Sequence, residues 1–159
     1  MLYAAGLRRA EIIALDLGDF DANGKLKIKG KRSKERTAYV NDEALDALTD
    51  WIALRGSSGG ALFCRINKGA SIIPGRLTTQ VIYNLLTKWG AEAGVEDFSP
   101  HDFRRTFISE LLDRGADIAT VSKMAGHANV TTTARYDRRP EEAKQKASKL
   151  LHLPYRKRK

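Results

Sequence analysis

The segment that decides the fold runs from Ser99 to Tyr136 and begins Ser-Pro-His-Asp-Phe-Arg-Arg-Thr-Phe. An apolar helical stretch follows, and the segment ends Met-Ala-Gly-His-Ala-Asn-Val-Thr-Thr-Thr-Ala-Arg-Tyr. In its first part, His101 and Arg104 are spaced so that a helix would place them on one face. In its second part, His127 follows a glycine, and Tyr136 comes nine positions later. Such side chains together can bind a phosphate, move protons and supply a nucleophile.

The same segment carries start and stop signals for three helices. Ser99 is a typical N-cap and is followed by proline, so a helix is predicted from position 100 until the next glycine. Asp117 is the expected cap of a second helix over 118–125. A Gly-His-Ala turn follows, and Asn129 is the expected cap of a third helix, which carries Tyr136.

Composition points to a polyanionic partner. The 159 residues include 28 Lys and Arg against 19 Asp and Glu, which gives a net charge of +9 and a pI near 9.8. This excess is typical of nucleic-acid-binding proteins, although many basic proteins bind nothing specific. Cys64 is the only cysteine, and neither a signal-peptide pattern nor a membrane-length apolar run is present. We expect one cytoplasmic domain with nucleic acid as its partner.

A short N-terminal helix presents another arginine. Residues 2–5 resemble the end of a helix whose start is missing, and Gly6 breaks it. Residues 7–15 then predict a short helix with three apolar residues available to the core: Leu7, Ile12 and Leu15. Arg8 lies near the N-terminus of this helix, where backbone N–H groups favour anions. Taken alone, Arg8 is better explained as a solvated surface arginine.

Residues 25–40 predict a small antiparallel sheet. Lys25–Lys29 alternates strictly after an Asn-Gly turn, so its lysines lie on one face, and residues 36–40 return as a second strand. Four cations lie at or near the tip between them: Lys31, Arg32, Lys34 and Arg36. Such a tip could reach into a nucleic-acid groove or along a phosphate backbone. A charged edge that resists aggregation is the alternative.

The middle of the chain and its last helix are predicted to have a structural role. Asn41 is the expected cap of a helix, residues 61–64 are expected to form a short strand or a buried extended segment, and residues 67–76 are expected to be irregular. A helix capped at Thr78 or Thr79 is predicted to end at Ala93 and to turn four apolar residues inward: Val81, Leu85, Leu86 and Trp89. After Pro140 the pattern predicts a final amphipathic helix that includes Leu150 and Leu151.

The singled-out residue types suit phosphoryl transfer without a metal ion. Transfer of a DNA phosphodiester to a side chain passes through a five-coordinate phosphorus, whose extra negative charge pre-positioned cations stabilise. No acidic cluster for a two-metal site stands out, and we expect no cofactor. A tyrosine hydroxyl, with a pKa of about 10 in water, needs a neighbour such as histidine to help remove its proton. A lysine on the hairpin tip could protonate the leaving 5′ oxygen.

Taken in order, these motifs resemble the catalytic domain of the tyrosine recombinases, the phage-integrase family. Residues 6–11 resemble its first arginine motif, and residues 30–36 resemble the hairpin that carries its lysine, with Lys34 as an alternative alignment. Residues 101–104 match its His-x-x-Arg box, and residues 126–127 match its Gly-His motif. The resemblance covers nearly the whole chain. By this resemblance the catalytic residues are Arg8, Lys31, His101, Arg104, His127 and Tyr136.

The resemblance implies a fold and a covalent intermediate. The expected fold is α+β and mainly α-helical, with a small antiparallel β-sheet. Tyr136 would attack a scissile phosphate, which gives a 3′-phosphotyrosyl link and a free 5′-hydroxyl. Arg8, Arg104 and His127 would hold the non-bridging oxygens of that phosphate.

It also implies roles for the surrounding residues. Lys31 would protonate the leaving oxygen, and His101 would assist proton transfer at the tyrosine. Glu11 is a candidate partner that orients Arg8, and an ordinary helix carboxylate is the alternative. The candidates for contacts with DNA are Arg32, Lys34, Arg36 and Arg105.

The resemblance further implies a longer protein that acts as an assembly. Family members carry an N-terminal core-binding domain that closes around DNA, and we expect residues 1–159 not to include it. We therefore expect residues 1–153 to be a truncated catalytic domain and residues 154–159 a basic C-terminal tail. The expected partners are double-stranded DNA and, in the full-length protein, three further copies that complete a homo-tetramer on DNA. Residues 140–153 are a candidate for docking on a neighbouring copy, with packing in the same chain as the alternative.

Three other functions are compatible with parts of the sequence. One is a non-catalytic DNA-binding remnant that occupies recombination sites without cutting. Another is a helix-turn-helix regulator built on residues 117–136, but Thr131–Thr133 make a poor base-reading surface and Arg8 and His101 stay unexplained. A type IB topoisomerase shares similar chemistry, but the short Gly-His-to-Tyr spacing favours the recombinases.

Overall fold

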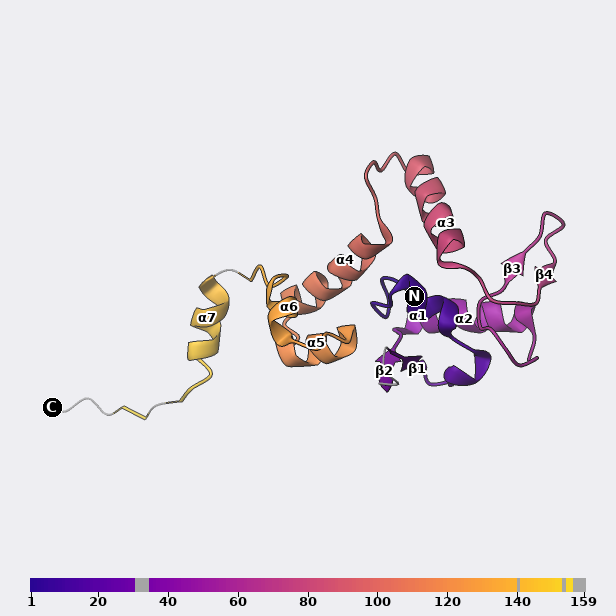
Figure 1. The fold of residues 1–159 in the computed structure, drawn as a ribbon. Helices are drawn as coiled ribbons and strands as arrows, with labels where there is room; N and C mark the ends of the chain where they lie inside the picture. The colour runs from indigo at the N-terminus through magenta and orange to yellow at the C-terminus, as the bar shows by residue number, and fades with distance from the viewer. Residues whose placement is uncertain (31–34, 140, 153, 156–159) are drawn as a thin grey trace.

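Helices predominate in the computed structural model of the chain, which describes residues 1–30, 35–139, 141–152 and 154–155 (Figure 1). The helices are α1 (Arg9–Ala14), the 3-10 helix η1 (Leu17–Asp19), α2 (Asp42–Arg55), α3 (Thr79–Glu92), α4 (Pro100–Asp113), α5 (Ile118–Ala125), α6 (Val130–Ala134) and α7 (Glu141–Ser148). The strands are β1 (Lys25–Lys29), β2 (Glu35–Tyr39), β3 (Arg65–Ile66) and β4 (Ile72–Ile73). They form two separate antiparallel pairs, β1–β2 and β3–β4. The predicted class, α+β and mainly helical, is confirmed.

The β1–β2 hairpin has one buried and one exposed face. Leu26 pairs with Ala38, and Ile28 pairs with Arg36. Leu26, Ile28 and Ala38 are all buried, while the three lysines of β1 are exposed, as the alternation predicted. Directly paired residues of antiparallel strands point to the same side of the sheet, so Arg36 lies on the buried face.

The larger hydrophobic core joins the N-terminal half of the chain to α3. Leu7, Leu26 and Leu62 are fully buried in it, which confirms the inward face of the N-terminal helix and the buried extended segment at 61–64. The Trp51 indole nitrogen donates a hydrogen bond to the Leu62 carbonyl at 2.8 Å and so fixes α2 against that segment. This core supports α1 and the hairpin from one side.

A smaller core holds α4, α5 and α6 together. Its buried residues are Phe107, Ile108, Leu112, Val121 and Ala125. Tyr136 packs against it. In Figure 1, α4, α5 and α6 gather in one group, and α7 stands apart from them. The site described below lies where the two cores meet.

The predicted caps place the helices of the second core. The Asp117 carboxylate accepts a hydrogen bond from the Thr120 backbone N–H at 2.8 Å, and Asn129 does the same for Thr131 at 2.9 Å. Ser99 is the N-cap of α4 as expected, but its hydroxyl donates to the Asp102 carboxylate at 2.6 Å. A hydroxyl that donates in this way stabilises the first turn through the carboxylate.

Tyr136 lies just after α6 and not within it. The helix ends at Ala134, and the Tyr136 backbone N–H donates to the Thr133 carbonyl at 2.9 Å in a tighter turn. The prediction that this helix carries the tyrosine was therefore wrong by two residues. Because the turn follows the helix directly, the side chain still lies beside it.

Two other segments differ from the prediction. Residues 2–5 form turns, with the Ala5 N–H donating to the Met1 carbonyl. Residues 67–76 were predicted to be irregular, but residues 65–66 and 72–73 pair as a short hairpin. The Asn67 N–H donates to the Ser71 carbonyl, and the Asn67 side-chain oxygen accepts from the Ser71 N–H, which closes the turn of this hairpin.

The faces of two helices also differ. α3 buries Ile82, Leu86 and Gly90, while Leu85 and Trp89 are 41% and 56% exposed, because α3 packs on one side only, against α1 and Phe98. α7 ends at Ser148, so the final leucines lie beyond it. Leu150 and Leu151 are both exposed, which does not favour packing within this chain.

Candidate functional site

Arg104 is the central side chain of the site. It comes from the first turns of α4 and is only 2% exposed. One guanidinium nitrogen donates to the Gly6 carbonyl and the other to the Ala125 carbonyl. Burial, and then the neighbouring charge of Arg8, lower the pKa of Arg104 to about 10, so the group stays charged at neutral pH. Arg104 therefore places a fixed positive charge between the two cores.

Arg8 adds a second guanidinium from the N-cap of α1. Its Nη1 pairs with Glu11 Oε1 at 2.9 Å, and its backbone N–H donates to Glu11 Oε2 at 2.7 Å. Its Nη2 donates to the Gly126 carbonyl at 3.4 Å. The Arg8 side chain is 47% exposed, so it can also reach a ligand. The expected pairing of Glu11 with Arg8 is present.

Arg36 provides a third guanidinium. From the sequence alone, Arg36 was predicted to contact DNA. Its Nη2 pairs with Glu11 Oε2 at 2.9 Å, and its side chain is only 16% exposed. Burial lowers the pKa of Arg36, and the charge of Glu11 opposes that shift. This geometry does not favour a direct contact between Arg36 and DNA. The alternation of β2 was the available signal, since Arg36 falls on the same face as Ala38.

Thr133 joins His127 to Tyr136. Its side chain is fully buried, and its hydroxyl oxygen lies 2.9 Å from His127 Nδ1. Its carbonyl accepts the hydrogen bond of the Tyr136 backbone N–H. The His127 and Tyr136 rings stack with their centroids 6.5 Å apart and their planes at 24°. From the sequence, Thr131–Thr133 were considered only as a poor base-reading surface, so the contact of Thr133 with His127 was not predicted.

Burial, together with the surrounding cations, keeps His127 neutral. Burial, followed by the charges of Arg104 and Arg8, lowers the pKa of His127 to about 4. A neutral imidazole has one N–H to donate and one nitrogen that accepts. Because Nδ1 faces Thr133, the other ring nitrogen is available to a ligand.

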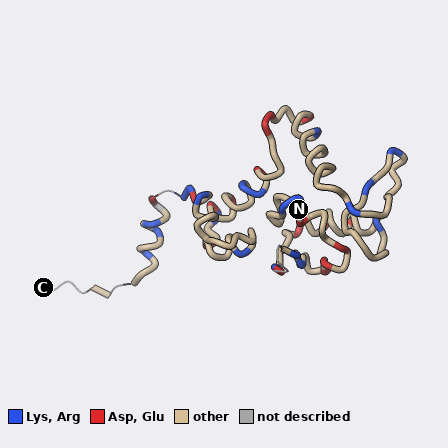
Figure 2. Tube along the Cα trace, viewed as in Figure 1, with Lys and Arg blue, Asp and Glu red and all other residues tan. Residues whose placement is uncertain are grey.

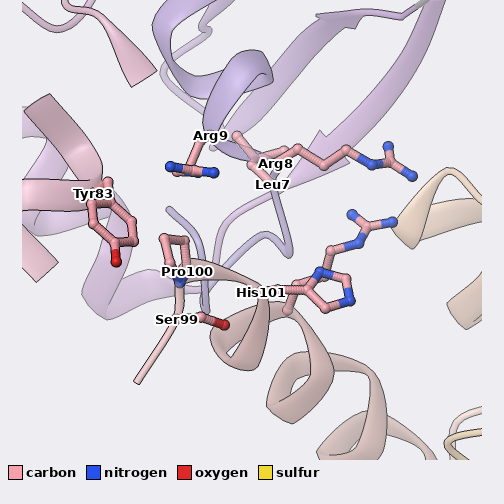
Figure 3. A pocket seen from close by; sticks show the side chains of 8 residues that line it. Leu7, Arg8, Arg9, Tyr83, Ser99, Pro100 and His101 are labelled. Carbon is pink, nitrogen blue, oxygen red and sulfur yellow. The ribbon is translucent and has the colours of Figure 1, made fainter. Parts of the chain in front are cut away.

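A pocket of about 240 Å³ opens beside these arginines (Figure 3). Arg8 and His101 lie at one end, and Arg104 also lines the pocket, as the shared helix face predicted. At the other end Arg9 lies over the Tyr83 ring, with its guanidinium carbon 5.6 Å from the centroid. Figure 3 shows Arg8 and Arg9 extending in opposite directions from adjacent positions. Neither Arg9 nor Tyr83 was singled out from the sequence.

The structure thus brings together five of the six predicted catalytic residues. Arg8, His101 and Arg104 share the pocket, and His127 with Tyr136 adjoins it through the Gly126 turn. The predicted Lys31, Arg32 and Lys34 lie outside the described residues. Arg105 is half exposed on α4, with its guanidinium 3.5 Å from Asp102.

Positive charge dominates this site. The three guanidinium groups of Arg8, Arg36 and Arg104 face the single carboxylate of Glu11. Such an arrangement attracts an anion. Within the described ranges, no three His, Cys, Asp or Glu side chains are grouped as ligands for a metal ion. In the same residues, no helix has the length and apolar character needed to cross a membrane.

Known proteins are similar to this chain in sequence. The model of the phage integrase family matches residues 1–142. The tyrosine recombinase XerC of Chromohalobacter salexigens is 38% identical over 143 residues, which cover 87% of this chain and 46% of that protein. XerC of Actinobacillus pleuropneumoniae is 36% identical over 141 residues, which cover 86% of this chain and 44% of that protein. The chain therefore spans less than half the length of these relatives.

Solved structures of recombinases have a similar fold. The XerA recombinase superposes with a TM-score of 0.74 and 25% identity, over 97% of this chain and 56% of that one. The XerH site-specific recombinase bound to its difH substrate superposes with a TM-score of 0.72 and 25% sequence identity, over 94% of this chain and 44% of that one. With five matched motif positions gathered around one cationic pocket and a family match over residues 1–142, this chain belongs to the phage integrase family.

Proposed function

We propose that this chain cleaves and rejoins DNA as the catalytic part of a site-specific tyrosine recombinase. The observation that carries the proposal is the gathering of two pocket arginines and two histidines beside one tyrosine. Arg8, His101 and Arg104 line the pocket, and the His127 ring stacks on Tyr136. A single anionic group that contacts all of them would have to be compact, as a phosphodiester is.

The charge balance of the site supports a phosphate ligand. Arg104 already uses two of its N–H groups on carbonyls, so its role is a fixed charge with limited freedom to move. Arg8 is half exposed and held on one side by Glu11. Fixed cations lower the barrier most, because they need no reorganisation when charge develops on the five-coordinate phosphorus. Arg8, Arg104 and the free N–H of His127 would bind the non-bridging oxygens.

The proposed cleavage step needs neither a cofactor nor a metal ion, because side chains of the protein accept and supply both protons. The Tyr136 oxygen attacks phosphorus and forms the phosphotyrosyl bond, while the bond from phosphorus to the 5′ oxygen breaks. His101 takes up the tyrosine proton, and Lys31 supplies a proton to the leaving 5′ oxygen. The covalent link conserves the energy of the phosphodiester, so the 5′-hydroxyl of another strand can reverse the step.

Duplex DNA is the proposed partner. The chain carries a net charge of +9, and Lys and Arg recur along the trace, including α7 and the turn between β3 and β4 (Figure 2). We assign DNA-backbone contacts to Arg32, Lys34 and Arg105. Residues 1–153 would form the catalytic domain and 154–159 a basic tail, in a cytoplasmic protein. The exposed Leu150 and Leu151 suit contact with a second copy in a tetramer on DNA.

Covalent trapping tests the proposal. The chain is mixed with nicked duplexes from its native locus in the presence of a chelator, and the products are separated on a denaturing gel. We expect a protein–DNA adduct that disappears in Tyr136→Phe. If the upstream coding region is needed for binding, the adduct should appear once that region is included.

The competing function predicts a different pattern. A DNA-binding remnant would bind the same duplexes with equal affinity in the wild type and in Tyr136→Phe, and neither would form an adduct. That result on verified target DNA, with the upstream region included, would rule out the proposed chemistry.

A further inference from the structure

Glu11 holds two arginines with one carboxylate. Its Oε1 pairs with Arg8 Nη1, while its Oε2 accepts from the Arg8 backbone N–H and pairs with Arg36 Nη2, all within 2.9 Å. Glu11 itself is 9% exposed. With both oxygens engaged, the carboxylate cannot rotate without losing a charge-assisted hydrogen bond. The position of Arg8 therefore depends on Arg36.

Arg36 also packs under the turn that leads to His127. A Cβ placed on Gly126 would lie 2.4 Å from Arg36 Nε and 2.8 Å from its Cδ, so the turn and the arginine are in close contact. Gly126 has a φ of +64°, which a glycine adopts without strain. Its carbonyl accepts from Arg8. The Gly126 turn is thus held between two arginines.

The burial of Arg36 is unfavourable for an ordinary scaffold residue. Its Nη1 is buried and donates to no acceptor among the described residues, and burial lowers the pKa of the guanidinium. A buried charge that does not satisfy its donors is weak support for stability, and an apolar side chain often does better. The arrangement is better explained by what Arg36 holds in place.

We propose that Arg36 is a positioning residue of the phosphate site. Through Glu11 it fixes the Arg8 guanidinium, and through its contact with Gly126 it fixes the turn that carries His127. The inference deepens the proposed function and rests on it for the identity of the reacting phosphate. Arg36 does not touch the DNA in this account, unlike the neighbouring hairpin cations.

The test compares Arg36→Met with a matched arginine outside the site. Arg76 anchors the other end of α1, where it donates to the Ile13 carbonyl at 2.7 Å and pairs with Asp16. Arg76→Met therefore removes a comparable anchor of the same helix. We expect Arg36→Met to slow single-turnover adduct formation at saturating nicked DNA by about tenfold to a hundredfold, because misplaced groups lose catalysis steeply. DNA affinity should change little, and Arg76→Met should leave the rate unchanged.

The conservative variant sharpens the test. Lysine keeps the charge but has no planar fork that can pair with Glu11 and pack along Gly126 at once, so Arg36→Lys should not restore the rate. Glu11→Gln combined with Arg36→Met should slow the reaction by less than the product of the two single effects, since the two residues share one contact. Multiplicative losses would overturn the inference, as would weaker DNA binding with an unchanged rate.

A second measurement needs no cleavage. Inorganic phosphate is titrated into the chain, and the amide signals of Gly126 and His127 are followed by NMR. Phosphate should bind the wild type and Arg76→Met equally, and Arg36→Met about tenfold more weakly. Equal phosphate affinity in Arg36→Met would overturn the positioning role even if no DNA adduct ever forms. If the phosphate affinities of the three proteins follow this expectation but no DNA adduct forms, the result would count against the proposed function alone.

Discussion

His127 shows how burial and neighbouring charge set the chemistry of one side chain. The ring is held on one side by the Thr133 hydroxyl and faces the charges of Arg104, Arg8, His101 and Arg36. Its pKa of about 4 makes it a neutral donor at physiological pH. A bound phosphate would offset the cations and allow a stronger hydrogen bond from this ring.

The lowered pKa predicts a loss of stability in mild acid. The unfolded chain binds a proton at His127 near pH 6.5, while the folded chain resists it until about pH 4. The free energy of unfolding should therefore fall as the pH drops through this window and be independent of His127 above it. His127→Gln should remove that part of the slope, as measured by urea unfolding at several pH values.

The N-terminal amine works in the same direction at higher pH, because burial lowers its pKa from 8.0. The comparison with His127→Gln isolates the histidine, since both proteins keep that amine. A wild-type slope between pH 6.5 and 4 that survives the substitution unchanged would show that His127 is not the group responsible.

Most residue types of the site were predictable, but their environments were not. Spacing alone placed His101 and Arg104 on one helix face, and both line the pocket. Nothing local to the sequence indicated that Arg104 would bond two carbonyls from distant segments or that Thr133 would hold the histidine. Those contacts depend on how the two cores meet, which is a tertiary property.

At the scale of elements, α4 depends on its first turn. Ser99 donates its backbone N–H and its hydroxyl to the Asp102 carboxylate, at 3.0 and 2.6 Å. The hydroxyl bond is the main reason why the pKa of Asp102 lies below its usual range. The same turn carries His101, so its order determines where that imidazole lies.

Ser99→Ala should destabilise the protein by about 1 kcal/mol, the usual cost of losing a helix-cap hydroxyl. The pKa of Asp102 should rise toward its ordinary value in the same variant. Urea unfolding and an NMR titration of the carboxyl measure the two effects. Ser57→Ala, in the exposed loop after α2, is the control and should change stability by less than about 0.5 kcal/mol. Equal effects of the two substitutions would contradict the role given to the cap.

Element boundaries were predicted where caps are local and missed where packing decides. Asp117 and Asn129 cap their helices as expected, because each bond joins residues two or three positions apart. The inward face of α3 was partly wrong, since only its contact with α1 and Phe98 selects Ile82 and Leu86 over Leu85 and Trp89. A helix with apolar residues all around it that packs on one side only has several faces that its sequence alone would allow.

For the whole molecule, the net charge of +9 predicts DNA binding that weakens steeply with salt. If Arg8 and Arg104 together neutralise the scissile phosphate and the three assigned backbone contacts each neutralise another, the logarithm of affinity should fall against the logarithm of salt with a slope of about −4. Fluorescence anisotropy over a range of salt concentrations measures this slope.

Two exposed arginines of α4 provide the matched pair for that measurement. Arg105 lies 3.5 Å from Asp102, and Arg114, at the C-cap, lies 3.4 Å from Glu110. Arg105→Gln should make the slope shallower by about one, whereas Arg114→Gln should leave it unchanged. Equal slopes in the two variants would remove Arg105 from the DNA contacts.

Arg104 joins the N-terminal segment to α5 by donating to the carbonyls of Gly6 and Ala125. Natural selection for a folded chain would therefore retain this arginine even in a lineage that no longer cuts DNA. Among the described residues, Arg8 reaches the other core only through one long, exposed hydrogen bond to the Gly126 carbonyl, and Tyr136 packs against the smaller core, so both are freer to drift once the chemistry is no longer needed. Among relatives of this chain, decayed copies should be recognised by changes at Arg8 and Tyr136, while an intact Arg104 says little about whether a copy is still active.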